Sequence, residues 1–441
     1  MIMDEESLKK FEEVILDALS SKLTGFDSSS DAKAFIEKTI KSINPTVTKE
    51  EIEKLVEDIN NFRPIEKYLD DEDIEDIMIN NTSNIFVYRA GEGQQLVPER
   101  FSNKKDLDKL VNKFEMYATT ATAHKNVYDV HMPNGSRVNI VNSPLGADIT
   151  IRNFKKHALS IIDLINSGML SYGLAARLWL YSEGLKIRPA NMLVGGLPAS
   201  GKTTLLNAMF SFFRPEERIV VIEETYELNT ETQENCVRLE TNPDVTMQEL
   251  VQNALRMRPD MLIIGEVRGA EAKDMMTAMN IGKIAMSTIH ASTSRDVITR
   301  LEHTPMDIDR NIITLVDVII MAAQVNENNK LVRRITQVSE IAGVETQVLL
   351  SDLFRYDYKT HKSTKMLPSV TYRDALAGVS SIEPNEILAE ETKRRRILEQ
   401  LNKIGVRDLR GINEFCKEYY DNPDRAVKKI DLPPVSVTQE S

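Results

Sequence analysis

Hydrophobic residues recur every three or four positions through the first part of the chain, at Leu8, Phe11, Ile15 and Leu19. This spacing is typical of one face of an amphipathic helix. Further along, Thr48 is followed three residues later by Glu51, which is the pattern of a capping box at the start of a helix. We therefore expect an N-terminal helical module over residues 1–62.

Short apolar stretches separated by turns follow the helical module. Ile74–Ile79 and Ile85–Tyr88 are rich in strand-forming residues, and the asparagines between them favour a turn. A second hairpin is predicted at residues 133–135, where Pro-Asn-Gly precedes another strand-like stretch. The pattern predicts an α+β N-terminal domain over residues 63–157, in which spacing alone reveals no catalytic constellation.

From residue 189 onward, apolar strands alternate with helical stretches, which predicts an α/β fold with a parallel central sheet. The strands are expected at Asn191–Val194, Arg218–Ile222, Met261–Ile264, Ile284–Thr288 and Val316–Met321, with strand-like pieces at Leu331–Ile335 and Gln347–Leu350.

The domain boundaries follow from this alternation. Residues 158–188 are expected to form a linker and a helix, and residues 189–382 a P-loop domain. Residues 383–430 are expected to form C-terminal helices, and the polar segment 431–441 a disordered tail.

The first predicted strand of the α/β domain runs into a glycine-rich loop. Gly196-Leu-Pro-Ala-Ser-Gly-Lys-Thr203 fits the pattern G-x-x-x-x-G-K-[ST]. The glycines allow backbone N–H groups to turn toward phosphate oxygens, and the following helix adds its positive end. We expect ATP here, with Lys202 on the β- and γ-phosphates and Thr203 on Mg²⁺. The predicted nucleotide-binding residues are Gly196, Pro198, Ala199, Ser200, Gly201, Lys202, Thr203 and Thr204.

Carboxylates follow two other predicted strands. Glu266 ends an apolar strand about 60 residues after the lysine, where a P-loop ATPase has its Walker B acid, and is expected to polarise the attacking water or hold a water on Mg²⁺. Three carboxylates, Glu223, Glu224 and Glu227, follow the strand before it. Their segment is a candidate for positioning water and metal, because ligands bind at the carboxyl ends of parallel strands. Taken alone, such residues are more often solvated charges.

One histidine and several arginines complete the candidate set. His290 follows a predicted strand and is expected to sense the γ-phosphate. Arg256, Arg258 and Arg268 are expected to stabilise phosphate charge, which is a common use of arginine in ring-forming ATPases. As isolated residues, such arginines are usually surface charges.

Composition narrows the choice of partners. The net charge of -12 opposes binding to a polyanion, so no nucleic-acid partner is expected. Two widely separated cysteines argue against disulfides and a cysteine zinc site, and fit a reducing cytoplasm. No apolar run reaches the roughly 20 residues of a membrane-spanning helix. The acidic first residues do not resemble a signal peptide.

Taken together, the motifs resemble the boxes of the type II/IV secretion and pilus-assembly ATPase superfamily. They occur in the order of that family: Walker A at 196–203, an Asp box at 222–228, a Walker B of the form Gly-Glu-Val-Arg at 265–268, and a His box at 287–291. Residues 253–269, 237–241, 134–139 and 150–154 are similar to the Tad/CpaF branch, and residues 394–430 resemble archaeal-type pilus assembly ATPases.

This resemblance implies a hexameric motor with a RecA-like P-loop domain. ATP would bind between the two domains, and Arg137 and Arg152 of the N-terminal domain would reach toward the nucleotide. The motor would act from the cytoplasm at the inner face of the membrane on an integral platform protein, and thereby assemble, or also retract, a type IV-like pilus.

Two departures from the family pattern stand out. Glu224 replaces the usual aspartate of the Asp box, and Lys283 stands where a first histidine is common in the His box. The same engine in an archaellum or a secretion system is the nearest alternative function. A RecA-like nucleic-acid motor and a scaffold that binds nucleotide without hydrolysing it are the others.

Overall fold

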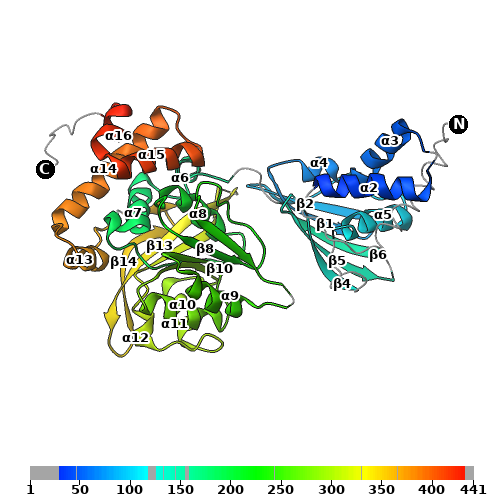
Figure 1. Cartoon of the computed structure of the whole chain (residues 1–441). Helices are drawn as coiled ribbons and strands as arrows, with labels where there is room; N and C mark the ends of the chain where they lie inside the picture. The colour runs from blue at the N-terminus through cyan, green and yellow to red at the C-terminus, as the bar shows by residue number, and fades with distance from the viewer. Residues whose placement is uncertain are drawn as a thin grey trace. The chain divides into compact units, whose positions relative to one another are not determined.

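The computed structural model describes residues 29–45, 47–117, 126–132, 134–144, 146–153, 158–242, 244–328, 330–364 and 366–432. It divides the chain into two compact units, Met1–Lys156 and His157–Ser441, which are both drawn in Figure 1. The helix predicted around residues 8–19 and nearly all of the predicted disordered tail lie outside the described residues. The predicted domain boundaries stay predictions.

The first unit combines short helices with an antiparallel sheet. Its helices are α2 (Ser29–Ile43), α3 (Lys49–Asn60), α4 (Glu66–Leu69) and α5 (Lys104–Glu115). Its strands are β1 (Ile74–Asn80), β2 (Asn84–Arg89), β3 (Gly93–Leu96), β4 (Val127–His131), β5 (Arg137–Ser143) and β6 (Gly146–Arg152). Within the described residues, these six strands form one sheet in the order β3-β2-β1-β6-β5-β4. The capping box predicted at Thr48 and Glu51 is confirmed at the start of α3.

Alternate residues of these strands form the core of the first unit. Ile77 and Ile79 of β1 and Ile149 and Ile151 of β6 are fully or nearly fully buried, as expected where one face of a sheet is covered. They belong to one hydrophobic cluster with residues of α2, α3 and α5. The unit therefore has a core of its own.

The second unit is built on a larger sheet (Figure 1). Its strands are β7 (Met192–Gly195), β8 (Ile219–Glu223), β9 (Cys236–Glu240), β10 (Met261–Glu266), β11 (Ile284–Ile289), β12 (Val318–Glu327), β13 (Lys330–Val344), β14 (Val348–Asp357) and β15 (Lys362–Ser363). In the part of the chain that the structure describes, they are ordered β15-β14-β13-β12-β7-β11-β10-β8-β9.

The predicted parallel sheet is confirmed between β9 and β12. Each of the five strands predicted for this region is present, although β12 starts two residues later than expected and runs six residues further. The pieces predicted near residues 331 and 347 belong to β13 and β14, which pair antiparallel with their neighbours. The edge strand β9, whose five residues are all half-buried, was not predicted from the sequence.

Helices cover both faces of this sheet. The α-helices are α6 (Ile161–Asn166), α7 (Tyr172–Glu183), α8 (Lys202–Met209), α9 (Met247–Ala254), α10 (Glu271–Asn280), α11 (Ser294–Glu302), α12 (Arg310–Ile313), α13 (Thr371–Gly378), α14 (Pro384–Lys403), α15 (Leu409–Asp421) and α16 (Pro423–Lys429). Three short 3-10 helices are η1 (Gly184–Lys186), η2 (Phe210–Phe212) and η3 (Leu255–Met257).

Neighbouring strand residues point to opposite cores, as the alternation of a strand requires. Val194 and Ile263 join the cluster formed with α7, α8, α14 and α15, whereas Leu193 and Ile264 join the cluster formed with α9, α10 and α11. The expected α/β fold with C-terminal helices is confirmed. No helix among the described residues is long and apolar enough to cross a membrane.

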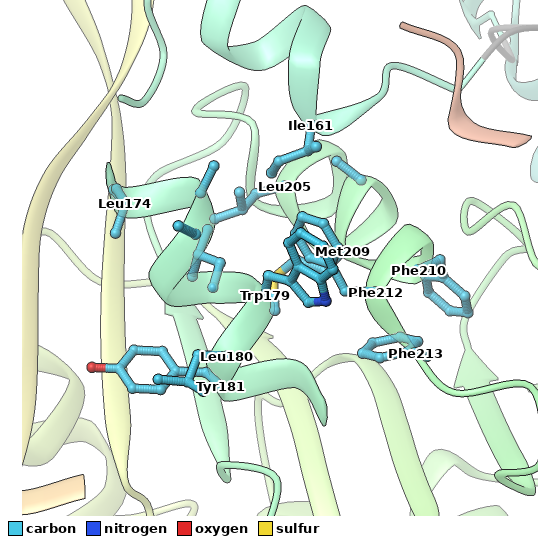
Figure 2. Close-up of a cluster of buried hydrophobic side chains, with 14 of the residues drawn as sticks. Ile161, Leu174, Trp179, Leu180, Tyr181, Leu205, Met209, Phe210, Phe212 and Phe213 are labelled. Carbon is cyan, nitrogen blue, oxygen red and sulfur yellow. The ribbon is translucent and has the colours of Figure 1, made fainter. Parts of the chain in front are cut away.

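Aromatic residues connect the P-loop helix to α7. Trp179 of α7 stacks on Phe212, with ring centroids 5.4 Å apart, and Figure 2 shows both rings beside Met209 at the end of α8. The indole N–H of Trp179 donates to Tyr420 Oη at 2.7 Å, and the Tyr420 hydroxyl donates to the Phe212 carbonyl at 2.5 Å. The C-terminal helices are therefore part of the packing around the P-loop helix.

Candidate active site

The predicted phosphate-binding loop links β7 to α8, and its shape requires glycine at two positions. A Cβ on Gly196 would lie 2.3 Å from Ser200 Oγ and 2.4 Å from the Ala322 carbonyl oxygen. Gly201 has φ 93°, in the left-handed region that favours glycine. Ala199 also has a positive φ, 61°, which is uncommon for alanine. The loop therefore keeps a tight curl that few sequences can adopt.

Lys202 is the first residue of α8 and lies inside this curl. Its side chain is buried, and Nζ donates to the carbonyl oxygens of Gly196 at 3.0 Å and Leu197 at 3.3 Å. Thr203 and Thr204 follow in the first turn of the helix and are half-buried, while Pro198 and Ala199 are exposed. An ammonium group at the positive end of a helix is suited to binding phosphate oxygens.

The polar groups of the loop fit a triphosphate with Mg²⁺. Ser200 Oγ is buried and has no hydrogen-bond partner among the described residues, so a ligand oxygen would satisfy it. The described residues contain no group of three or more His, Cys, Asp or Glu side chains that could hold a metal ion. Mg²⁺ is usually bound by one or two protein oxygens together with substrate phosphates and water, and the half-buried Thr203 at the start of α8 would supply one such oxygen.

Glu266 and His290 are brought together at the carboxyl ends of β10 and β11. His290 Nε2 lies 2.7 Å from Glu266 Oε1, and His290 Nδ1 lies 3.3 Å from Lys202 Nζ. The hydroxyl of Thr288 donates to the Gly265 carbonyl at 2.7 Å, which aligns the two strand ends. Three residues that are distant in the sequence thus form one continuous polar chain from the phosphate loop to the Walker B carboxylate.

The histidine in this chain is held in its neutral form. Burial lowers the pKa of His290, and the charge of Lys202 lowers it further, while Glu266 acts in the opposite direction. A neutral imidazole accepts a hydrogen bond at one nitrogen and donates at the other. His290 Nδ1 lies 3.3 Å from Lys202 Nζ and 3.3 Å from the Gly196 carbonyl oxygen. Nε2 faces Glu266 Oε1, which is buried and has no hydrogen-bond partner among the described residues.

Arg268 links Glu266 to the Asp box. Its guanidinium contacts Glu266 Oε2 at 2.7 Å and Glu224 Oε1 at 3.0 Å. Hydrogen bonding to Glu266 raises the pKa of Arg268. Glu224, which replaces the usual aspartate of the Asp box, thus reaches the arginine of the Walker B box. The predicted residues Glu224 and Arg268 therefore belong to the same group of charges as Glu266.

Glu223 ends β8 inside the Asp box and is one of the three carboxylates of the segment predicted to position water and metal. It is almost fully buried, and its Oε1 accepts the backbone N–H groups of Glu227 at 2.9 Å and Leu228 at 3.0 Å. Burial raises its pKa to about 7. Glu223 therefore shapes the segment that carries Glu224 and Glu227.

Arg256 and Arg258 lie elsewhere in this unit. They precede Met261, the first residue of β10, and are exposed. The phosphate loop follows the carboxyl end of β7. Because the strands are parallel, the two arginines lie at the opposite, amino ends of the strands. They are not part of the polar chain around Glu266, and their predicted catalytic role stays a prediction.

Arg137 and Arg152 belong to the first unit and are partners on adjacent strands, β5 and β6. Arg137 donates to Asp129 at 3.1 Å, and Arg152 is exposed. The pairing of these two positions was not evident from the sequence. Their predicted action on ATP stays a prediction.

The β12–β13 hairpin contributes a contact that the sequence did not suggest. Arg333 of β13 donates from Nε to the Ala199 carbonyl of the phosphate loop at 3.0 Å. It lies more than 130 residues after the loop, and no motif marks it. Only the position of β12 beside β7 brings the two together.

The family model of the type II/IV secretion system protein matches residues 58–402, which is most of the chain. The chain belongs to this family. The expectation of an ATPase of the secretion and pilus-assembly superfamily is thereby confirmed, while the Tad/CpaF branch stays a prediction.

Individual relatives agree with this membership. An uncharacterized protein of Methanocaldococcus jannaschii is 30% identical over 380 residues, which cover 82% of this chain and 68% of that protein. A second uncharacterized protein of the same organism is 37% identical over 232 residues, covering 49% of this chain but only 32% of that relative's length. This chain thus spans only part of some relatives.

A solved structure shares the fold. The pilus retraction motor PilT with bound ADP has a TM-score of 0.50 and 14% identity, and the alignment covers 85% of this chain and 97% of that one. At this identity, the likeness supports the fold alone.

Proposed function

We propose that this secretion-family ATPase is a hexameric motor that couples ATP hydrolysis to the assembly of a type IV-like pilus, of the Tad or archaeal kind. It would act at the inner face of the cell membrane on an integral platform protein. The observation that carries the proposal is the polar chain from Lys202 through His290 to Glu266. This chain joins the phosphate-binding end of the site to the carboxylate that would act on water.

The roles of the residues follow from their chemistry. Lys202 and the N–H groups at the start of α8 would bind the phosphates, and the Thr203 hydroxyl would hold Mg²⁺, which supplies positive charge to the transferring group. Glu266 would polarise the attacking water. His290 would report the state of the phosphate site to Glu266, because it contacts Lys202 on one side and Glu266 on the other.

Replacing Glu266 with Gln tests the catalytic assignment. Because a positioned acid or base typically contributes about 100-fold or more to the rate, we expect the kcat for ATP to fall by about that factor, with ATP still bound. Glu345→Gln is the matched control, since Glu345 is exposed and lies in the turn between β13 and β14. Equal rates for wild type and Glu266→Gln would show that Glu266 is not catalytic.

The machine and the oligomer need separate experiments. Light scattering with ATP is expected to give the mass of six 50.0 kDa chains. Cells that lack the gene are expected to lose pili and to regain them with wild type but not with Lys202→Ala. Intact pili together with a lost secreted protein would instead indicate a secretion motor.

A further inference from the structure

The β12–β13 hairpin extends beyond the strand at its side. β12 pairs with β7 from Val318 to Met321, opposite the last residue of β7, and then continues to Glu327. β13 returns along this extension, with Arg333 opposite Gln324. The hairpin therefore lies beside the phosphate loop, which starts where β7 ends. A Cβ at position 196 would lie 2.4 Å from the Ala322 carbonyl oxygen of the hairpin.

The hairpin is held firmly in this place. Arg334 forms two hydrogen bonds to Glu327 at 2.9 and 2.8 Å and donates to the Ser167 carbonyl at 3.1 Å. The Tyr356 hydroxyl donates to Glu327 at 2.5 Å, and the Ile335 N–H donates to the Met169 carbonyl at 2.8 Å. The backbone of Arg333 is thus fixed by anchored neighbours.

Arg333 contacts the loop at its most constrained point. Its Nε donates to the carbonyl of Ala199 at 3.0 Å, and its Cδ would lie 3.2 Å from a Cβ on Gly201. Ala199 has φ 61°, which alanine rarely adopts without support. A hydrogen bond from a charged donor is among the stronger ones in proteins, so it can supply this support.

The orientation of the Ala199 carbonyl also decides where the next N–H points. A carbonyl and the following N–H belong to one planar, trans peptide and point in opposite directions. Holding the Ala199 carbonyl toward Arg333 turns the Ser200 N–H in the opposite direction, where it donates to the Leu197 carbonyl of the same loop at 3.3 Å. The direction of such N–H groups matters because the backbone N–H groups of a P-loop bind the phosphates.

We propose that Arg333 is a positioning residue of the ATP site, which keeps the phosphate loop in its binding conformation by holding the Ala199 peptide. The inference rests on the proposed ATP site at this loop. When the binding-competent conformation is less populated, the apparent affinity for ligand falls by the same fraction. Chemistry after binding is unaffected, so Arg333 acts on the affinity for ATP more than on the rate of hydrolysis.

Replacing Arg333 with Met in the full-length protein tests the inference. We expect KM for ATP, and the Kd of a fluorescent ATP analogue, to rise about tenfold, which is about 1.4 kcal/mol, while kcat changes little. Arg355→Met is the matched control, because Arg355 is an exposed arginine of β14 paired with Asp352. Both constants are expected to stay at the wild-type value in this control.

A second substitution separates positioning from simple attraction of charge. Glycine adopts a positive φ without strain, so Ala199→Gly is expected to make the loop less dependent on Arg333. In that background, Arg333→Met should weaken binding by a clearly smaller factor than in the wild-type background. Equal factors in both backgrounds would overturn positioning and indicate that Arg333 attracts phosphate by its charge.

Other outcomes are equally decisive. Unchanged affinity in Arg333→Met would overturn the inference, and so would a loss of kcat without a change in KM. If Arg333→Met does not fold, as judged by circular dichroism, Arg333→Lys keeps the charge and the stem and is expected to bind ATP more weakly than wild type. Lys202→Ala tests the ATP site itself: if that variant binds ATP normally, the proposed function fails whatever Arg333 does.

Discussion

Single residues at the strand ends determine the electrostatics of the site. Glu223 is a carboxyl group with little access to water, surrounded by the N–H groups of Glu227 and Leu228 and by Arg238 at 3.4 Å. Burial outweighs these partners and raises its pKa to about 7. A Cβ on Gly265 would lie 3.2 Å from Glu223 Cγ, which is a tight contact.

The raised pKa of Glu223 predicts how stability depends on pH. Between pH 4.5 and 7 the folded protein keeps a proton that the unfolded chain releases, so the contribution of this carboxyl to stability falls as the pH rises through that range. The change from 4.5 to about 7 corresponds to about 3 kcal/mol at most. The melting temperature of wild type should therefore fall between pH 5 and pH 8 relative to that of Glu223→Gln. Parallel curves for the two proteins would contradict this prediction.

At the scale of elements, buried ion pairs join the C-terminal helices to α7. Arg394 of α14 is fully buried and pairs with Glu183 at the end of α7. Arg177 of α7 binds Glu391 of α14 through two hydrogen bonds, at 2.6 and 2.7 Å. The guanidinium of Arg394 also lies 4.9 Å from the ring of Trp179, which Figure 2 places next to the end of the P-loop helix.

Adjacent arginines on α14 allow a matched test of this attachment. Arg394→Met leaves Glu183 buried without its partner, a change that typically costs about 3–5 kcal/mol. Arg395 is exposed and pairs with Glu399 on its own helix, so Arg395→Met is expected to cost less than about 1 kcal/mol. Thermal unfolding followed by circular dichroism should show a large drop in melting temperature for the first variant alone. A similar drop for both would mean that the pair does not anchor α14.

Buried strands could be predicted from the sequence, whereas half-buried strands could not. Strands β7, β8, β10 and β11 are almost entirely apolar because helices cover both of their faces, and the apolar runs identified them. Residues 236–240 form β9 at the sheet edge, where half-burial permits Arg238 and Glu240 among apolar residues. No apolar run marks such a strand. The antiparallel pairing of β13 and β14 likewise could not be predicted from the sequence, since the direction of a strand depends on how the chain connects it to its neighbours.

At the scale of the whole molecule, each unit has its own core. The cluster of the first unit contains residues up to Ile151, and the two clusters of the second begin at Ile161 and Leu193. The phosphate loop, Glu266, His290 and Arg333 all belong to the second unit. Arg137 and Arg152 belong to the first.

This division predicts the behaviour of a fragment. Residues 157–441 expressed alone are expected to fold and to bind the fluorescent ATP analogue, because every phosphate contact proposed for the P-loop lies within them. Hydrolysis is expected to be slower than in the full chain, since the arginines predicted to assist it are missing. In the full chain, Arg137→Gln and Arg152→Gln should lower kcat, whereas Arg89→Gln on strand β2 should not. A fragment as active as the full chain would show that these arginines are dispensable.

The sequence by itself determined the local chemistry of this protein. The spacing of Gly196, Gly201, Lys202 and Thr203 specifies a phosphate loop, because a curl of this kind depends on glycine at fixed positions. Apolar runs specify the parallel strands, and the order of the four boxes identified the family. These signals are local, and each is contained within a few residues.

Only the tertiary structure decided which distant groups meet. The polar chain from Lys202 through His290 to Glu266 depends on β7 and β10 lying on either side of β11. The contact of Arg333 with Ala199 depends on the extension of the β12–β13 hairpin beyond the end of β7. Because the strands are parallel, Arg256 and Arg258, which precede β10, lie at the other end of the strands from the phosphate loop. The order of the strands, their directions and the distance by which one extends past its neighbour all arise from packing across the whole sheet. They therefore cannot be predicted from any short stretch of sequence.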